Sequence, residues 1–250
     1  MRLAVAIAVL ILSGCGGTAV SGGSPRELLP DLVQSPPAAL TVYRAGDGWR
    51  LAFLSAVENH GRGPMLIEGR RPDTGTPTMT VTQLVRRTDG STVEHPVAGA
   101  IRFVVSETHR HWHYLDFERY ELLTADGKLV GRVQKTGFCL GDRYDAEASM
   151  RLPGEPALPV WTQECERGQP ARLVVEEGIS PGYGDDYVPK LEGQSVDITG
   201  LSAGRYFLRH RVNVGGALRE SSYANNSASA AFELRWSKAG TPHVAAVYDG

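Results

Sequence analysis

Three of the chain's seven histidines occupy alternate positions in the run His109-Arg-His-Trp-His113. Successive side chains of a strand point to opposite faces, so the three imidazoles share one face while Arg110 and Trp112 lie on the other. On a straight strand the outer Cα atoms would lie about 13 Å apart, so one ion can reach all three rings only if the strand bends or bulges. Imidazoles without a nearby thiolate suit copper, zinc, iron or nickel, and affinity alone favours Cu(II). The run therefore predicts a metal site, with copper first and zinc second; the alternative is a basic, solvated strand face.

The elements that must position these histidines are strands. Turn signals such as Asp126-Gly127, which predicts a hairpin with a primed turn, separate short runs of β-forming residues. The expected strands are residues 39–43, 49–57, 79–86, 101–105, 119–124, 128–135, 171–175, 204–214 and 228–236. Residues 140–170 and 176–195 are expected to be long irregular loops. No long amphipathic helix is visible, so we predict an all-β fold, most simply a β-sandwich.

Composition limits the classes of partner. The chain has 250 residues, 42% of them hydrophobic, and a net charge of −2, which is typical of one globular domain with a short leader. This balance predicts no large basic surface for nucleic acid and no polybasic patch for a membrane.

The N-terminus predicts export. An apolar run over residues 3–12 follows Arg2 and is too short to span a bilayer, so it is typical of a signal peptide. It ends in Leu-Ser-Gly-Cys15, which resembles the lipobox of bacterial lipoproteins. We therefore expect a signal peptide over residues 1–14, a lipid anchor on Cys15 and a Gly/Ser-rich tether over 15–28, with the protein on the extracytoplasmic face of the cell membrane. The alternative is an ordinary secretory leader.

The two remaining cysteines, Cys139 and Cys165, predict one disulfide bond in an exported protein. The alternative is a pair of free buried thiols.

Several segments together resemble the lysyl oxidase family in their order and spacing. They are the histidine run, Tyr120-Glu-Leu-Leu123, Lys135-Thr-Gly-Phe-Cys-Leu140, Gly178-Ile-Ser-Pro-Gly182 with Asp185 and Tyr187, and Asp197-Ile-Thr199. The resemblance covers roughly residues 29–236. It implies that residues 29–250 form a lysyl oxidase-like catalytic domain, β-sandwich-like and with long irregular loops.

The resemblance also implies a set of site residues. His109, His111 and His113 would bind copper. Lys135 and Tyr187 would cross-link into lysine tyrosylquinone, with Tyr183 as the alternative tyrosine. Asp185 matches a family aspartate and is the candidate general base, with Asp186 second.

A second site follows from the same resemblance. An early Pro-Asp-Leu and a late Glu-Ser-Ser-Tyr-Ala-Asn-Asn segment are similar to family segments that hold calcium. Oxygen ligands for this hard cation would come from Asp31, Glu220, Asn225, Asn226 and the carbonyl of Leu32. Ser222 stands where the family has an aspartate; the alternative is a capped turn joining the two ends of the domain.

The implied function is a copper-dependent amine oxidase. It would convert primary amines, such as a lysyl side chain or a small amine, to aldehydes with dioxygen, releasing hydrogen peroxide and ammonia. Two alternatives remain: a non-catalytic extracytoplasmic module that binds copper or zinc, and a zinc hydrolase with three histidine ligands and an open position for water.

Overall fold

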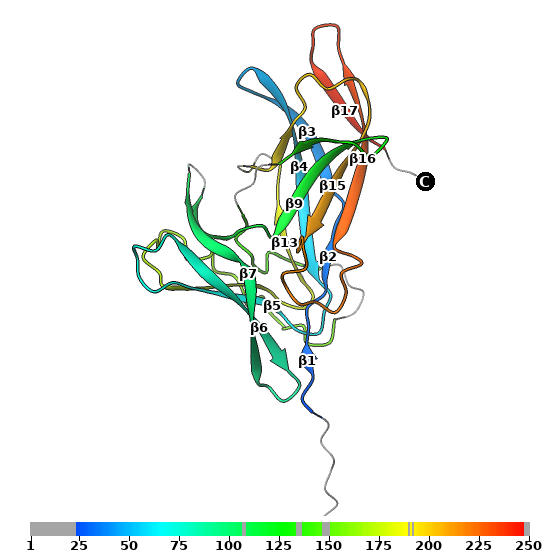
Figure 1. The fold of residues 1–250 in the computed structure, drawn as a ribbon. Coiled ribbons are helices and arrows are strands. Elements are labelled where there is room, and N and C mark those ends of the chain that lie inside the picture. Colours follow the sequence, from blue (N-terminus) through cyan, green and yellow to red (C-terminus); the bar gives the residue numbers. More distant parts are fainter. Residues whose placement is uncertain are drawn as a thin grey trace, which may run out of the picture.

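The computed structural model describes residues 24–247, apart from 107–108, 134–136, 147–150, 190 and 192. Within these residues all regular secondary structure is β-strand, which confirms the predicted all-β fold (Figure 1). The described part contains no helix long and apolar enough to cross a membrane. The strands are β1 (Glu27–Leu28), β2 (Leu32–Gln34), β3 (Ala38–Ala45), β4 (Gly48–Asn59), β5 (Met65–Arg70), β6 (Thr78–Arg87), β7 (Thr92–Val105), β8 (Arg110–Tyr114), β9 (Glu118–Thr124), β10 (Leu129–Arg132), β11 (Tyr144–Asp145), β12 (Val174–Ile179), β13 (Tyr183–Tyr187), β14 (Ser195–Asp197), β15 (Gly204–Val212), β16 (Ser227–Trp236) and β17 (Pro242–Val247).

These strands form three antiparallel sheets. One has the order β12-β5-β6-β7-β8, with β1 paired to β6. A second has the order β10-β9-β15-β16-β17, and the third is built around β4, which pairs with β2, β3, β13 and β14. Figure 1 shows β9, β15 and β16 lying over β3 and β4, while β5, β6 and β7 extend to one side.

The core lies between these layers because the strands alternate in burial. On β15 the side chains of Tyr206, Leu208, His210 and Val212 are buried, and those between them are more exposed. Hydrophobic side chains of β4, β9 and β16 meet the same cluster, including Phe53. This period of two is the pattern of a sheet with one face on the core.

Three expectations about the elements need correction. Residues 176–195 are not one irregular loop, because β12 continues to Ile179 and both β13 and β14 pair with β4. Pairing with a central strand satisfies the backbone of segments whose glycines and aspartates have low β-propensity. Residues 92–100 extend β7. At the N-terminus, residues 27–28 of the expected tether form β1 and pair with β6; Cys15 and the expected signal peptide lie outside the described residues.

Candidate functional site

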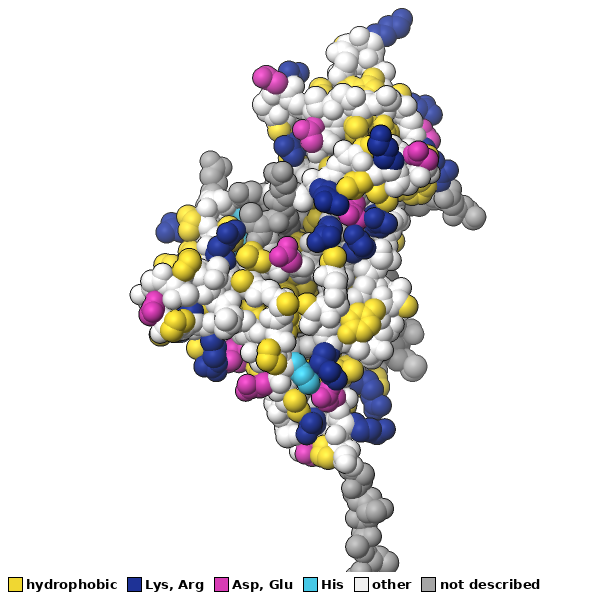
Figure 2. All heavy atoms as spheres, viewed as in Figure 1, with side chains coloured by type: hydrophobic (Ala, Val, Ile, Leu, Met, Phe, Trp, Pro, Cys, Tyr) yellow, Lys and Arg dark blue, Asp and Glu magenta, His cyan; other side chains and the backbone are white. Residues whose placement is uncertain are grey.

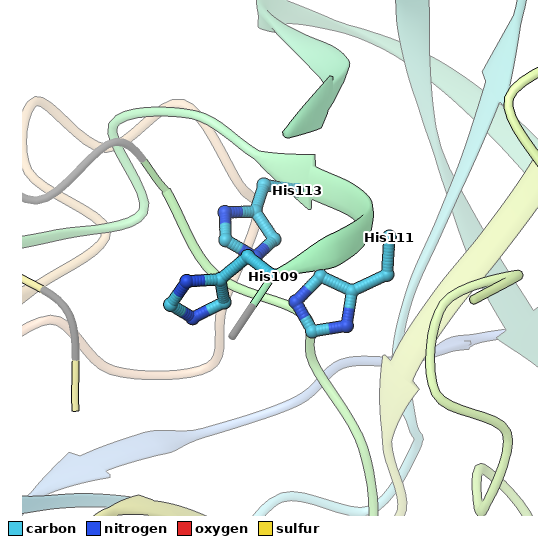
Figure 3. A group of neighbouring side chains, drawn as sticks. All are labelled: His109, His111 and His113. Atoms are coloured by element: carbon cyan, nitrogen blue, oxygen red, sulfur yellow. The ribbon is translucent and has the colours of Figure 1, made fainter. Parts of the chain in front are cut away.

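The three histidines come together on one short segment. His111 and His113 lie on β8, and His109 immediately precedes it. Pairing with β7 runs from Val105 opposite Arg110 to Ile101 opposite Tyr114 without a register shift, so a bend rather than a bulge gathers the rings. Figure 3 shows the chain curving past the three side chains. One ligand atom from each histidine lies within 4.8 Å of the others, which is the convergence that a single ion needs.

The electrostatics of this group suit a metal. Both ring nitrogens of His111 are buried and have no hydrogen-bond partner among the described residues. Burial, together with the neighbouring His109 and Arg167, lowers the pKa of His111 to about 4. The ring is therefore neutral at pH 7, and neutral imidazole is the form that binds metals. Buried polar atoms normally have partners, so the orphaned nitrogens fit a site that a copper or zinc ion completes.

Tyr187 ends β13 and faces the same region. Its hydroxyl donates to the carbonyl of Cys139 at 2.9 Å and to Oδ2 of Asp185 at 3.2 Å. Its ring meets Phe138 edge to face, with centroids 5.2 Å apart. Burial, followed by the negative charges of Asp185 and Glu118, raises the pKa of Tyr187 well above its usual value. Without a cation nearby, the phenol therefore stays protonated.

A pocket of about 320 Å³ brings two of the histidines and the tyrosine together. His109, His111, Asp185, Asp186 and Tyr187 are among its lining residues. A larger groove of about 720 Å³ lies between β3 and β15–β17 and is lined by proline, alanine and other uncharged side chains. The smaller pocket is therefore the one that carries chemistry.

Asp185 positions the Tyr187 hydroxyl through a hydrogen bond and is also the candidate base. Its side chain is 1% exposed, Gly141 N donates to its Oδ2 at 3.3 Å, and Arg143 Nε lies 3.6 Å from its Oδ1. The alternative tyrosine, Tyr183, lies four residues earlier on β13, about 13 Å along the strand from Tyr187. Its hydroxyl is directed to the carbonyl of Pro156 at 3.5 Å, so the structure favours Tyr187 over Tyr183 as the tyrosine of this pocket.

Lys135 lies outside the described residues, but its described neighbours adjoin the site. Val133 N donates to the carbonyl of Tyr120 at 3.2 Å, and Phe138 exchanges backbone hydrogen bonds with Tyr114. A Cβ atom on Gly137 would lie 3.0 Å from Cβ of His113 and 2.8 Å from the carbonyl oxygen of Tyr114, so this glycine packs directly on β8.

The predicted disulfide is confirmed and braces the site. Cys139 is bonded to Cys165, whose carbonyl accepts a hydrogen bond from Trp112 N on β8 at 3.0 Å. The bond thus links the residue that accepts from Tyr187 to the strand that carries the histidines. Trp112 is fully buried, and its ring centroid lies 4.7 Å from the guanidinium carbon of Arg71.

Sequence reasoning missed a buried polar network beneath Phe138. Nε2 of His210 lies 2.8 Å from Oε2 of Glu118, and the same oxygen accepts from the hydroxyl of Tyr120. Gln34 Nε2 lies 2.7 Å from Nδ1 of His210 and also donates to the carbonyl of Ala56, so the proton of the ring is on Nε2. The sequence signal that could have found His210 is the alternation of hydrophobic and polar residues along β15, which places position 210 on the face that points into the core.

The predicted calcium residues also lie together. Glu220 Oε2 accepts from Leu32 N and Oε1 accepts from Asn226 Nδ2, both at 2.7 Å, while Asn225 Nδ2 donates to Asp31 at 2.9 Å. The Oδ1 atoms of both asparagines are buried, and no hydrogen-bond partner for them lies in the part of the chain that the structure describes. Burial raises the pKa of Glu220, although its hydrogen bonds act in the opposite sense.

The fold and this site define a class: an all-β protein with three convergent histidines, suited to hold a metal ion, beside a buried tyrosine. Comparison with known proteins then gives the family. The family model for lysyl oxidase matches residues 80–241. Lysyl oxidase homolog 2B of Danio rerio and lysyl oxidase homolog 2 of Xenopus laevis are 26% and 29% identical over 221 residues, which cover 84% of this chain. Human lysyl oxidase homolog 3 is 31% identical over 134 residues, or 53% of this chain and 16% of the homologue.

The chain belongs to the lysyl oxidase family. It spans about a quarter of the length of the first two homologues, 26% in each case.

Proposed function

We propose that this chain is a copper-dependent amine oxidase whose quinone cofactor is made from Lys135 and Tyr187. The observation that carries the proposal is the shared pocket, in which His109 and His111 line the same space as Tyr187. The histidine nitrogens, mutually within 4.8 Å, fit copper. When bound, copper and the quinone supply the redox chemistry and the carbonyl that condenses with a primary amine. The products would be an aldehyde, hydrogen peroxide and ammonia.

The chain's own residues hold the phenol and manage its proton. The Cys139 carbonyl and the Asp185 carboxylate both accept from the Tyr187 hydroxyl, and Phe138 fixes the plane of the ring. Asp185 is our candidate proton acceptor because it is already within hydrogen-bond distance of the reacting ring. Asp186 lines the same pocket and is the second candidate.

The charges around the pocket favour a cationic substrate. Asp185 and Glu164 are paired with Arg143 and Arg167, so Asp186 is the carboxylate of this pocket that is left to attract a cation among the described residues. A protonated primary amine is attracted to such a pocket before it loses its proton. A lysyl side chain or a small amine would satisfy this requirement.

Peroxide release from primary amines by copper-loaded protein tests the proposal. We expect Lys135→Ala and Tyr187→Phe to abolish peroxide release and to remove reaction with phenylhydrazine. The matched controls are Lys128→Ala, in the β9–β10 turn, and Tyr183→Phe, on the same strand as Tyr187; both should retain activity. Equal activity in Tyr187→Phe and Tyr183→Phe would refute the cofactor assignment.

Phenylhydrazine also separates the two alternatives. A zinc hydrolase built on the three histidines contains no carbonyl and should be insensitive to the reagent. A non-catalytic copper or zinc module would bind metal, react with no carbonyl reagent and release no peroxide. Either outcome with fully copper-loaded protein would replace the oxidase proposal.

Two further proposals concern a second metal ion and the cellular location of the protein. A calcium ion bound between Asp31, Glu220 and the two asparagines is supported by the unpartnered amide oxygens there. An extracytoplasmic, lipid-anchored location is supported by the leader sequence and by the disulfide, which suits an oxidising compartment. Cys15→Ala should move the protein from the membrane fraction to the soluble fraction.

A further inference from the structure

A single carboxylate on the outer face of the β10-β9-β15 sheet is covered by arginines. Glu121 lies on β9 directly opposite Arg209 on β15 and Arg132 on β10. Arg209 Nη2 and Nε donate to Glu121 Oε2 at 2.7 and 3.1 Å, and Arg211 Nη2 donates to the same oxygen at 3.0 Å. Arg132 Nε lies 3.7 Å from Oε1. The carboxylate is only 4% exposed, although its face of the sheet points away from the core.

A fourth arginine increases the excess of positive charge. Arg119 precedes Glu121 by two residues on β9, so it shares the same face, and it lies directly opposite Arg211. Like charges in directly opposed positions of a sheet repel each other. The four arginines and one glutamate carry a net charge of +3, in a chain whose net charge is −2. Figure 2 shows basic side chains gathered around an acidic one over these strands.

The cluster has more hydrogen-bond donors than its carboxylate can use. Each guanidinium has five N–H donors in a rigid fork. Arg211 Nε is buried and has no acceptor among the described residues. The side chains of Arg132, Arg209 and Arg211 are 61, 36 and 33% exposed, so the surplus donors are open to solvent. On β16 the neighbouring positions Ser227 and Ser229 add no negative charge.

We propose that this arginine cluster is a binding site for a phosphate group. Guanidinium forks match tetrahedral oxyanions, and each charge-assisted contact is stronger than a neutral hydrogen bond. The planar carboxylate of Glu121 uses only some of these donors and competes for them, whereas an anion with three or more oxygens can bridge donors from three strands. The phosphate could be a free ion or the headgroup of an anionic lipid, which share this chemistry. The site is independent of the proposed oxidase pocket.

Calorimetric titration of the full chain with inorganic phosphate tests the site. We expect binding that weakens as sodium chloride is raised. Arg119→Gln combined with Arg211→Gln should weaken it at least tenfold. The matched control, Arg86→Gln combined with Arg235→Gln, removes the same charge from exposed positions elsewhere and should change it less than twofold. Glu121→Gln removes the competing carboxylate and should tighten phosphate binding.

Flotation with vesicles distinguishes the two sources of phosphate. Greater recruitment to phosphatidylglycerol than to phosphatidylcholine vesicles, lost in the Arg119/Arg211 variant, identifies a lipid headgroup. Phosphate binding without such recruitment identifies the free ion. The proposal is overturned if phosphate does not bind, if both double variants bind equally, or if Glu121→Gln weakens binding.

Discussion

Replacing Glu118 should reveal how much the buried network contributes to stability. Its side chain is 1% exposed and that of its partner His210 is fully buried. Glu118→Ala removes the acceptor of His210 Nε2 and one acceptor of the Tyr120 hydroxyl. The Tyr120 hydroxyl keeps its hydrogen bond with Ser55. Because the ring proton of His210 is on Nε2, the alanine variant leaves this buried N–H without its acceptor and also removes one hydrogen bond of Tyr120, which together cost about 2–4 kcal/mol. Glu118→Gln keeps an acceptor oxygen of similar shape, so we expect a loss of about 1 kcal/mol.

Urea unfolding of metal-free protein, with the disulfide intact, measures both values. With a slope of about 2–3 kcal/mol per molar urea, the midpoint should fall by about 1–2 M for Glu118→Ala and by less than 0.5 M or so for Glu118→Gln. Because Tyr120 packs on Phe138, with ring centroids 6.2 Å apart, the alanine variant should also loosen the wall behind Tyr187. Equal losses in the two variants, or a loss below about 1 kcal/mol for alanine, would refute the reasoning.

Three further predictions concern His111 on β8, the proposed calcium site around Glu220, and the disulfide. Because the pKa of His111 is lowered to about 4 from 6.5, the unfolded chain takes up its proton first as the pH falls, so this residue's contribution to stability is lost between about pH 6.5 and 4. In metal-free protein, His111→Phe should therefore reduce the slope of the unfolding free energy against pH in this range, by less than about 1.4 kcal/mol per pH unit. An unchanged slope in urea unfolding would contradict this. Calcium should raise the melting temperature of the wild type more than that of Glu220→Gln, and an equal rise in both would remove the site. Cys139→Ser combined with Cys165→Ser should lower the free energy of unfolding by about 3–4 kcal/mol, measured by thermal or urea unfolding. The double variant should also retain copper less well. Unchanged copper retention would show that the disulfide does not brace β8.

Much of the site could be predicted from sequence because its signals are local or carried by family motifs. The alternation of His109, His111 and His113 can be read from five residues. The distance between the outer Cα atoms of a straight strand already required a bend or a bulge for one ion to reach all three rings. The choice of Tyr187 over Tyr183 came from motif spacing, and the structure places only Tyr187 in the pocket with the histidines.

What could not be predicted depends on pairings between distant segments. β13 has one glycine and two aspartates between its two tyrosines, and its sequence resembles a loop until β4 supplies its hydrogen bonds. The Glu118–His210 contact joins residues 92 positions apart. The prediction that the chain has no large basic surface rested on total charge, which cannot show that β9, β10 and β15 collect four arginines on one face.

The most direct test of the oxidase proposal is peptide mass spectrometry of protein expressed with copper and exposed to air. The proposal predicts one cross-linked peptide that contains both Lys135 and Tyr187, absent from protein prepared without copper. Two separate, unmodified peptides from fully copper-loaded protein would contradict it.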